Sequence, residues 1–271
     1  MNPKPEQVKQ PVIRVRDLVT SYGNTKILHG VSLSVDPGEI MVIMGGSGSG
    51  KSTLLRYMLG LHRPDSGSIE ILGEEIQKLS GRQWRKLRQK MGVSFQGGAL
   101  FNSMTVGENV CMPLREHSRL DDNTIRIMSR MKLEVVNLAG FEDLMPSQLS
   151  GGMVKRAALA RAIVMDPSIL FFDEPSAGLD PVVSAELDEL ILRLRDALNV
   201  SVVVVTHELD SAFKIADRIT VLDKGHILMV GTVDEVRNSD NARVRNLLTR
   251  TIEDIPVDAD DYLRRLTEGT A

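Results

Sequence analysis

The chain has 271 residues, of which 42% are hydrophobic, enough for the core of one large α/β domain or two smaller ones. Its 33 basic and 36 acidic residues give a formal net charge of -3, so the overall charge does not favour nucleic acid as a partner. The single cysteine, Cys111, excludes an internal disulfide, and no Cys/His spacing in the sequence indicates a zinc site.

The N-terminal stretch, residues 1–11, is polar and carries prolines, without the apolar run of a secretory signal. Apolar runs elsewhere, such as 168–172 and 201–205, are far shorter than the ~20 residues that span a bilayer. We therefore expect the chain to remain in the cytosol and to reach any membrane through a partner.

Short β-branched and apolar segments alternate with helical segments along the chain, and several are apolar on both faces. The expected strands lie at 12–19, 39–44, 91–95, 168–173, 201–207 and 218–231. Strands that are apolar on both faces are typical of a parallel sheet covered by helices. The sequence therefore predicts an α/β fold.

A different pattern fills residues 97–165, where helical periodicity is rich in Met, Leu and Ala. This periodicity is interrupted at 112–123 and again at Pro146. We interpret the segment as a helical subdomain inserted into the α/β core.

The chain becomes polar from about Asp240, with one short helix and an acidic linker before 261–266. We interpret residues 240–271 as a C-terminal extension of a domain that spans residues 1–239.

A glycine-rich motif follows the apolar segment 39–44 and opens a helical segment, in the pattern G-x-x-x-x-G-K-[ST]. Glycines let backbone N–H groups approach phosphate oxygens, and a helix N-terminus favours their negative charge. A flexible linker would not stand between a buried strand and an amphipathic helix. The motif predicts a nucleotide phosphate site formed by Gly45, Gly46, Ser47, Gly48, Ser49, Gly50, Lys51, Ser52 and Thr53. We expect Lys51 at the β/γ-phosphates, Ser52 on Mg²⁺ and Thr53 at the α-phosphate.

Two adjacent acids, Asp173 and Glu174, end the apolar segment 168–172. Ligands of open parallel sheets bind beyond such carboxyl ends, so these acids are expected near the phosphates. We expect Asp173 to help hold Mg²⁺ and Glu174 to act as the general base toward the attacking water. An Asp-Glu-Pro turn alone is common, and its pairing with the phosphate motif strengthens the catalytic interpretation.

Nucleotide kinases, GTPases, helicases and transporter ATPases share both features, so other residues must discriminate among them. Leu149-Ser150-Gly151-Gly152 resembles the signature of ABC ATPases and stands just upstream of the acid pair, as in that family. We expect Ser150 to cap a helix that begins with glycines, leaving N–H groups for another phosphate. A plain serine-capped helix is the structural alternative for this stretch alone. The sequence contains no Asn-Lys-x-Asp motif, which GTPases use to read guanine. It also contains neither the tandem cassettes nor the coiled-coil insertion that are usual in ABC proteins of DNA repair or of the ribosome.

The resemblance to ABC ATPases extends from about residue 12 to 235 and assigns further positions. Tyr22, in an expected loop at 20–28, matches the aromatic residue that stacks on adenine, and Gln96 matches the residue that contacts metal or water. The segment 178–180, ending in Asp180, matches the loop that communicates between protomers, and His207 matches the histidine that contacts the γ-phosphate. The implied fold is a P-loop NTPase nucleotide-binding domain: a RecA-like core, an antiparallel β subdomain and an inserted helical subdomain.

The resemblance also implies a head-to-tail homodimer that binds ATP and Mg²⁺ between one protomer's phosphate loop and the other's signature. Ser150 and Gly152 would then contact the γ-phosphate in trans, with Gly151 between them. Opening and closing of the dimer would move a permease. Met153 stands where the family usually carries glutamine, and we expect altered tuning without loss of activity.

The residues after Gln96 resemble the ATPase subunits of Mla phospholipid-trafficking transporters and of relatives that serve MCE-type lipid-binding proteins. The matching segments are 96–101, 109–110 and 113–117. The resemblance implies ATP-driven phospholipid trafficking between the inner and outer membranes, which maintains outer-membrane lipid asymmetry. ATPases of polar amino acid or methionine importers share the segment 105–110 and are the alternative. We expect Ala99, Leu100 and Phe101 to supply an apolar socket for the permease, although some of them could instead build the subdomain core.

The resemblance implies three partners: an MlaE-like membrane permease, an MlaD-like periplasmic MCE lipid-binding protein and an MlaB-like STAS-domain protein. It also implies that this chain is peripheral at the cytoplasmic face of the bacterial inner membrane. No nucleic acid partner is implied. We expect the C-terminal extension to lay Tyr262, Leu263 and Leu266 on the neighbouring protomer, and a truncation after Thr251 would test this.

Overall fold

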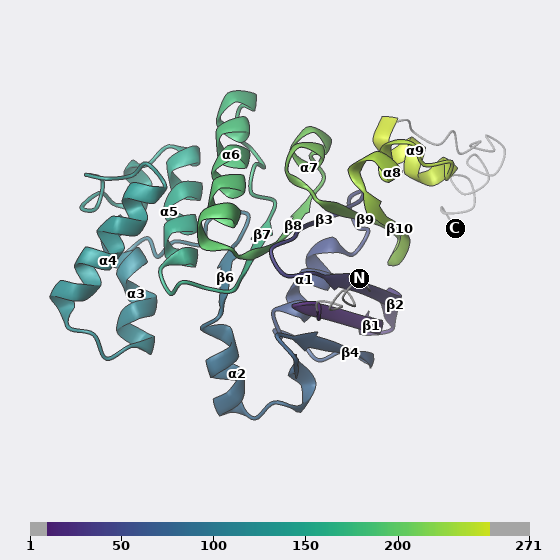
Figure 1. Ribbon diagram of the computed structural model, residues 1–271, viewed down its shortest axis with the longest axis horizontal. Helices are drawn as coiled ribbons and strands as arrows, with labels where there is room; N and C mark the ends of the chain where they lie inside the picture. The colour runs from purple at the N-terminus through teal and green to yellow at the C-terminus, as the bar shows by residue number, and fades with distance from the viewer. Residues whose placement is uncertain (1–9, 250–271) are drawn as a thin grey trace, which may run out of the picture.

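Two β-sheets organise the protein, and the computed structural model describes them within residues 10–249 (Figure 1). A four-stranded antiparallel sheet has the order β2-β1-β4-β5. Its strands are β1 (Ile13–Tyr22), β2 (Thr25–Val35), β4 (Ser66–Ile71) and β5 (Glu74–Glu75). A six-stranded sheet has the order β10-β9-β3-β8-β7-β6. Its strands are β3 (Ile40–Met44), β6 (Met91–Ser94), β7 (Ile169–Asp173), β8 (Ser201–Thr206), β9 (Arg218–Asp223) and β10 (His226–Thr232).

The six-stranded sheet is parallel from β9 to β6, and β10 is added antiparallel to β9. Successive side chains of a strand point to opposite faces, so β3 contributes to two separate cores. Val42 and Met44 belong to one buried cluster, and Met41 and Ile43 belong to the other. Burial on both faces explains the uninterrupted apolar runs, and it confirms the predicted α/β fold class.

Helices cover both faces of this sheet. On one face α1 (Lys51–Met58) packs between the two sheets, where Leu54, Leu55 and Met58 share a core with β1, β2 and β4. The other face carries α6 (Pro181–Leu198) and α7 (Leu209–Ile215), seen above the sheet in Figure 1. The remaining elements of these parts are α2 (Gly81–Arg88), α8 (Val233–Arg237), α9 (Ala242–Thr249) and the 3₁₀ turns η1 (Ile76–Lys78) and η2 (Pro146–Gln148).

Three helices gather at one end of the molecule, farthest from the antiparallel sheet (Figure 1). They are α3 (Val106–His117), α4 (Asp122–Val135) and α5 (Gly151–Ile163), and all three lie inside the segment expected to be helical. Capping residues fix where they begin, because Thr105, Asp121 and Ser150 each accept a hydrogen bond from the first turn. Among residues 10–249, none of the helices combines the length and apolar character that a membrane span needs.

The expected interruption at 112–123 is wrong over its first half. The helix α3 continues through Pro113 to His117, and the break is confined to 118–121. Proline removes one hydrogen bond near the end of the helix. Burial of Val110 and Leu114 on the same helix face offsets that loss.

The loop expected at 20–28 is also wrong, because β1 runs to Tyr22 and β2 begins at Thr25. Gly23, with φ +56°, makes the tight hairpin turn between them. The strand β2 was not predicted, since exposed polar side chains alternate with its buried ones and lower its apolar content. The residues expected to reach the neighbouring protomer, Tyr262, Leu263 and Leu266, and the truncation point Thr251 lie outside the described residues.

Candidate functional site

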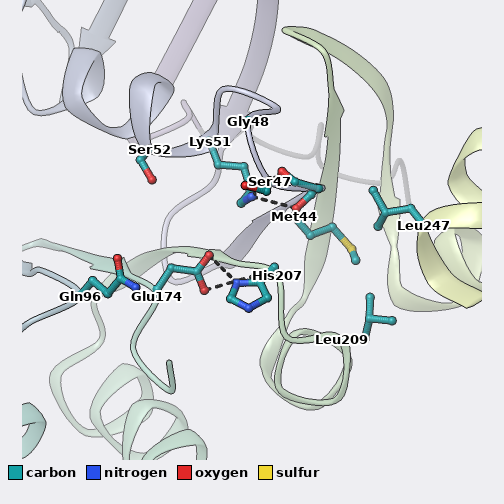
Figure 2. A pocket seen from close by; sticks show the side chains of 12 residues that line it. Met44, Ser47, Gly48, Lys51, Ser52, Gln96, Glu174, His207, Leu209 and Leu247 are labelled. Atoms are coloured by element: carbon teal, nitrogen blue, oxygen red, sulfur yellow. Dashed lines mark hydrogen bonds and ion pairs between the residues drawn. The ribbon is translucent and has the colours of Figure 1, made fainter. Parts of the chain in front are cut away.

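A cavity of about 550 Å³ opens at the carboxyl ends of β3, β7 and β8 (Figure 2). Parallel strands deliver their following residues to the same edge of the sheet, which explains why motifs far apart in sequence meet there. Nine of the predicted residues line the cavity: Gly45, Gly46, Ser47, Gly48, Lys51, Ser52, Gln96, Glu174 and His207.

The glycine-rich loop depends on two of its glycines for its shape. A Cβ at Gly45 would lie 2.0 Å from the carbonyl oxygen of Leu222, and Gly48 has φ +73°. The loop ends at Gly50, where α1 begins without a side-chain cap and without an acid in its first turn. The first N–H groups of α1 and the positive end of its dipole therefore remain available to an anion.

Lys51 is buried beside this loop, and its Nζ donates to the carbonyl oxygens of Gly45 at 2.8 Å and Gly46 at 3.0 Å. Burial lowers the pKa of the Lys51 ammonium, while the charges of Glu174 and Asp173 act in the opposite direction. A desolvated ammonium with acceptors on one side is suited to bind phosphate oxygens on another.

Asp173 and Ser52 face one another from the end of β7 and the start of α1. The Ser52 hydroxyl donates to Asp173 Oδ1 at 3.3 Å. Burial raises the pKa of the Asp173 carboxyl, and the Ser52 hydrogen bond opposes this shift. In residues 10–249 no group of three or more His, Cys, Asp or Glu side chains could form a metal cage. A hydroxyl and a single carboxylate fit Mg²⁺, which keeps several waters and substrate oxygens as ligands.

The Glu174 side chain is held by the end of β8 (Figure 2). Its Oε1 lies 2.8 Å from His207 Nδ1, and its Oε2 accepts from the Thr206 hydroxyl at 3.2 Å. The residue adopts φ +49°, which costs a non-glycine residue about 1–3 kcal/mol. Such strain persists only where neighbouring contacts enforce it, and here it aims the carboxylate into the cavity.

The signature residues are not part of this cavity. Ser150, Gly152 and Met153 instead line a second cavity of about 230 Å³, next to α6. Ser150 Oγ accepts from the Met153 N–H at 3.3 Å, as expected of a helix cap. Gly152 is required by packing, since a Cβ there would lie 2.7 Å from Val183 Cγ1. One chain therefore carries the phosphate loop and the signature on separate surfaces.

The other predicted residues also lie outside the cavity lining. Tyr22 is 45% exposed and meets the His62 ring edge-on at 6.1 Å. Asp180 caps α6, accepting from the Val182 and Val183 N–H groups, both at 3.1 Å. Five more predicted residues are absent from the lining of the 550 Å³ cavity: Ser49, Gly50, Thr53, Gly151 and Asp173.

The expected apolar socket after Gln96 divides between surface and core. Phe101 is 46% exposed, whereas Leu100 packs against the helical core. The fully buried Asn109 holds this loop, accepting from the Phe101 N–H at 2.8 Å and donating to its carbonyl at 3.1 Å. The segment thus contains one exposed aromatic residue and one residue of the core, and contact with a permease stays a prediction.

Sequence reasoning missed several residues of the site. Met44, Leu209 and Leu247 line the cavity, and Leu247 comes from α9 in the expected C-terminal extension. No local pattern distinguishes these apolar residues from core residues. Thr206 could have been found, because it lies in the predicted strand 201–207, immediately before His207.

Comparisons with known proteins agree with this arrangement. The family described as ABC transporter matches residues 28–177. The intermembrane phospholipid transport system ATP-binding protein MlaF of Haemophilus influenzae is 41% identical over 265 residues, covering 96% of this chain and 100% of that protein. MlaF of Escherichia coli K12 is 42% identical over 269 residues, covering 98% and 100%. The probable ribonucleotide transport ATP-binding protein mkl of Mycobacterium tuberculosis H37Rv is 41% identical over 236 residues, covering 87% of this chain and 66% of that protein.

Solved structures show the same fold. The dimeric post-hydrolysis state of the ATP-binding cassette MJ0796, bound to ADP and Pi, has a TM-score of 0.76 at 31% identity, covering 82% of this chain and 98% of that one. The cbiO1 protein of Clostridium perfringens, part of an ABC transporter complex, has a TM-score of 0.77 at 28% identity, covering 90% and 100%.

Proposed function

This chain belongs to the ABC transporter family as an ATP-binding and ATP-hydrolysing subunit, and we propose that its ATPase cycle powers phospholipid trafficking between the inner and outer membranes. The observation that carries the proposal is the full-length match to MlaF proteins, at 41% and 42% identity over 96% and 98% of the chain. The mkl protein matches as closely per residue, but the chain covers only 66% of it. The full-length match also favours phospholipid over polar amino acids or methionine as cargo.

ATP binding is proposed to replace contacts that the phosphate loop makes with itself. Lys51 would exchange the carbonyl oxygens of Gly45 and Gly46 for the β/γ-phosphates, and the uncapped start of α1 would receive the same charge. Thr53 would bind the α-phosphate, and exposed Tyr22 would stack on adenine. The left-handed turn at Gly48 leaves backbone N–H groups free to line the phosphates.

Hydrolysis is proposed to use Glu174 as the general base that accepts a proton from the attacking water. His207 is hydrogen-bonded to its Oε1 and would orient the carboxylate. The other ring nitrogen, Nε2, lies 3.5 Å from Glu208 Oε1 and would exchange this contact for the γ-phosphate. The Thr206 hydroxyl fixes the second carboxylate oxygen. Gln96, which lines the same cavity, would position the water or the metal.

Mg²⁺ is proposed as the cofactor, held by the Ser52 hydroxyl with Asp173 and Gln96 close by. The hydrogen bond between Ser52 and Asp173 supports this assignment, because hydroxyl and carboxylate oxygens are the donors that the ion prefers. The bound ion would neutralise negative charge on the β- and γ-phosphates.

The active unit is proposed to be a head-to-tail homodimer. The signature lines a different cavity from the phosphate loop, so Ser150, Gly151 and Gly152 would reach the nucleotide of a partner copy. The dimeric form of the MJ0796 cassette with ADP and Pi supports this arrangement. Asp180, at the start of α6, would lie beside the same interface.

A subunit of this family works with a membrane permease. We propose an MlaE-like permease contacting exposed Phe101, with an MlaD-like MCE protein beyond it and an MlaB-like STAS-domain protein on the ATPase. The subunit would be peripheral at the cytoplasmic face of the inner membrane.

The deciding experiment is purification of the tagged chain from its native membranes in detergent, followed by mass spectrometry of bound proteins and lipids. We expect a permease, an MCE protein and phospholipid, with ATP turnover that disappears in Glu174→Gln. Co-purification of an amino acid importer, or ATP turnover stimulated by ribonucleotides, would contradict phospholipid as cargo.

A further inference from the structure

Lys155 lies on α5, five residues after the signature serine, and only 7% of it is exposed. Its Nζ donates to the Gln96 carbonyl oxygen at close range and to the Glu174 carbonyl oxygen at 3.2 Å. A single ammonium group thus joins three elements: the signature helix, the loop after β6 and the turn after β7. Burying an ammonium is costly without partners, so these contacts are needed for its placement.

The helix α5 also binds the loop after β6 through a second side chain. Arg161 donates to the carbonyl oxygens of Gly98 and Ala99, both at 2.8 Å. Together Lys155 and Arg161 bind three of the four carbonyl groups of the segment 96–99, so this segment and α5 are expected to move as one body. Exposed Phe101 lies two residues beyond this segment, where a partner subunit could contact it.

Lys155 differs from Arg161 because it also reaches the strained backbone of Glu174. The Glu174 N–H donates to the Val205 carbonyl oxygen at 2.8 Å, which fixes one side of its peptide unit. The Glu174 carbonyl oxygen accepts from the Lys155 ammonium and from the Ala177 N–H at 3.3 Å. Burial lowers the pKa of Lys155, and the negative charges of Glu174 and Asp173 oppose that shift.

We propose that Lys155 is a positioning residue, which transmits movement of the loop after β6 to Glu174 by holding the Gln96 and Glu174 carbonyl groups on one ammonium. The proposal rests on the proposed ATPase function and not on the identity of the cargo. It places the residue between the surface that meets the permease and the proposed general base. No contact between Lys155 and ATP is required.

Three variants of the complex test this role: Lys155→Met, Lys155→Arg and Arg161→Met. Methionine has a similar length without donors, and arginine keeps both charge and donors. We expect Lys155→Met to lower kcat at least tenfold while KM for ATP stays within about twofold, because the nucleotide contacts are intact. Lys155→Arg should recover most of the lost kcat. Arg161→Met should keep basal kcat near that of the wild type and reduce only the stimulation by the permease.

Two results would overturn the proposal. The first is a Lys155→Met variant with wild-type kcat. The second is an equal loss of kcat in Lys155→Met and Lys155→Arg, accompanied by weaker ATP binding and a lower Tm, because this combination would indicate a packing role. A fluorescent ATP analogue measures binding to each variant and confirms that it is folded. If the wild type itself failed to hydrolyse ATP, the proposed function would be wrong before the variants were compared. A cargo other than phospholipid would leave the Lys155 measurement unaffected.

Discussion

The helices α1 and α5 both begin at glycine-containing motifs, and their N-termini differ in how they are capped. The helix α1 begins at a left-handed glycine with no side-chain cap, beside a 550 Å³ cavity that contains Lys51, Glu174 and His207. The helix α5 begins at Ser150, whose own side chain caps it, beside a smaller cavity that lacks those groups. The first N-terminus has Lys51, Glu174 and His207 around it, whereas the charged residues that line the cavity at the second, Arg156 and Glu186, are paired with each other.

The difference indicates which half of the site is complete in one chain. An uncapped helix start surrounded by Lys51, Ser52 and Glu174 can bind and process a phosphate with residues of the same chain. A capped start can add contacts to a phosphate that another surface already holds. The comparison therefore predicts separable defects: the α1 side controls ATP binding and chemistry, and the α5 side controls closure around ATP.

The largest effect is expected from Glu174→Gln. The amide keeps the size of the side chain but cannot accept the proton of water, so ATP turnover should fall by roughly 10²–10⁴-fold. ATP binding should persist, and the variant should accumulate as a dimer with ATP, measured by light scattering. Turnover at the wild-type rate would remove Glu174 from its proposed role.

A smaller effect is expected from Lys51→Ala, and it should appear in binding. Charge-assisted hydrogen bonds contribute about 1.5–3 kcal/mol each, so the loss predicts roughly 10- to 150-fold weaker ATP binding, measured by titration calorimetry. The matched control is Lys86→Ala, which removes an exposed lysine from α2. If the control weakened ATP binding equally, net charge and not the phosphate loop would explain the result.

The α5 side is tested by comparing Ser150→Asp with Ser150→Ala. Aspartate is also a good cap and should preserve stability, whereas alanine should lower the free energy of unfolding by about 1 kcal/mol. Aspartate would also place a negative charge toward the partner's nucleotide, so its ATP turnover should fall further than that of alanine. If Ser150 were a helix cap alone, the order would reverse, with aspartate near wild type. ATP binding by the monomer should remain normal in both variants.

The α1 side could be predicted from sequence because its motif is contiguous and its partners follow buried strands. Glu174 and His207 directly follow β7 and β8, and parallel topology brings the ends of these strands to one edge. The apolar strand before Glu174 was therefore enough to place this residue near the phosphate loop, whereas His207 was assigned there by the family resemblance. Family resemblance added the role of Ser150, which local physics alone could not separate from ordinary capping.

Residues that act through tertiary packing could not be predicted in this way. Leu247 and Lys155 occupy helices whose sequences give no sign of what they contact, since the contacts lie far away in the chain. The strand β2 was missed because exposed polar residues interrupt its buried ones, and the length of α3 was missed because Pro113 usually marks a helix end. In each case packing against other elements outweighs the local signal.

The smallest expected effect is a gain in stability from Asp173→Asn, measured without nucleotide. Burial raises the pKa of Asp173, so the folded state binds more protons than the unfolded state between the two pKa values. Stability of the wild type should therefore fall as pH rises through that window, and the cost of ionisation is fully present above it. Asparagine carries no such cost, so its advantage in Tm should be near zero at low pH and grow toward neutral pH.

The control is Asp143→Asn, which replaces an exposed carboxyl and should show no such dependence of Tm on pH. A Tm advantage independent of pH would mean that ionisation of Asp173 is not the cause, and a loss of stability would mean that its contact with Ser52 contributes more than burial costs.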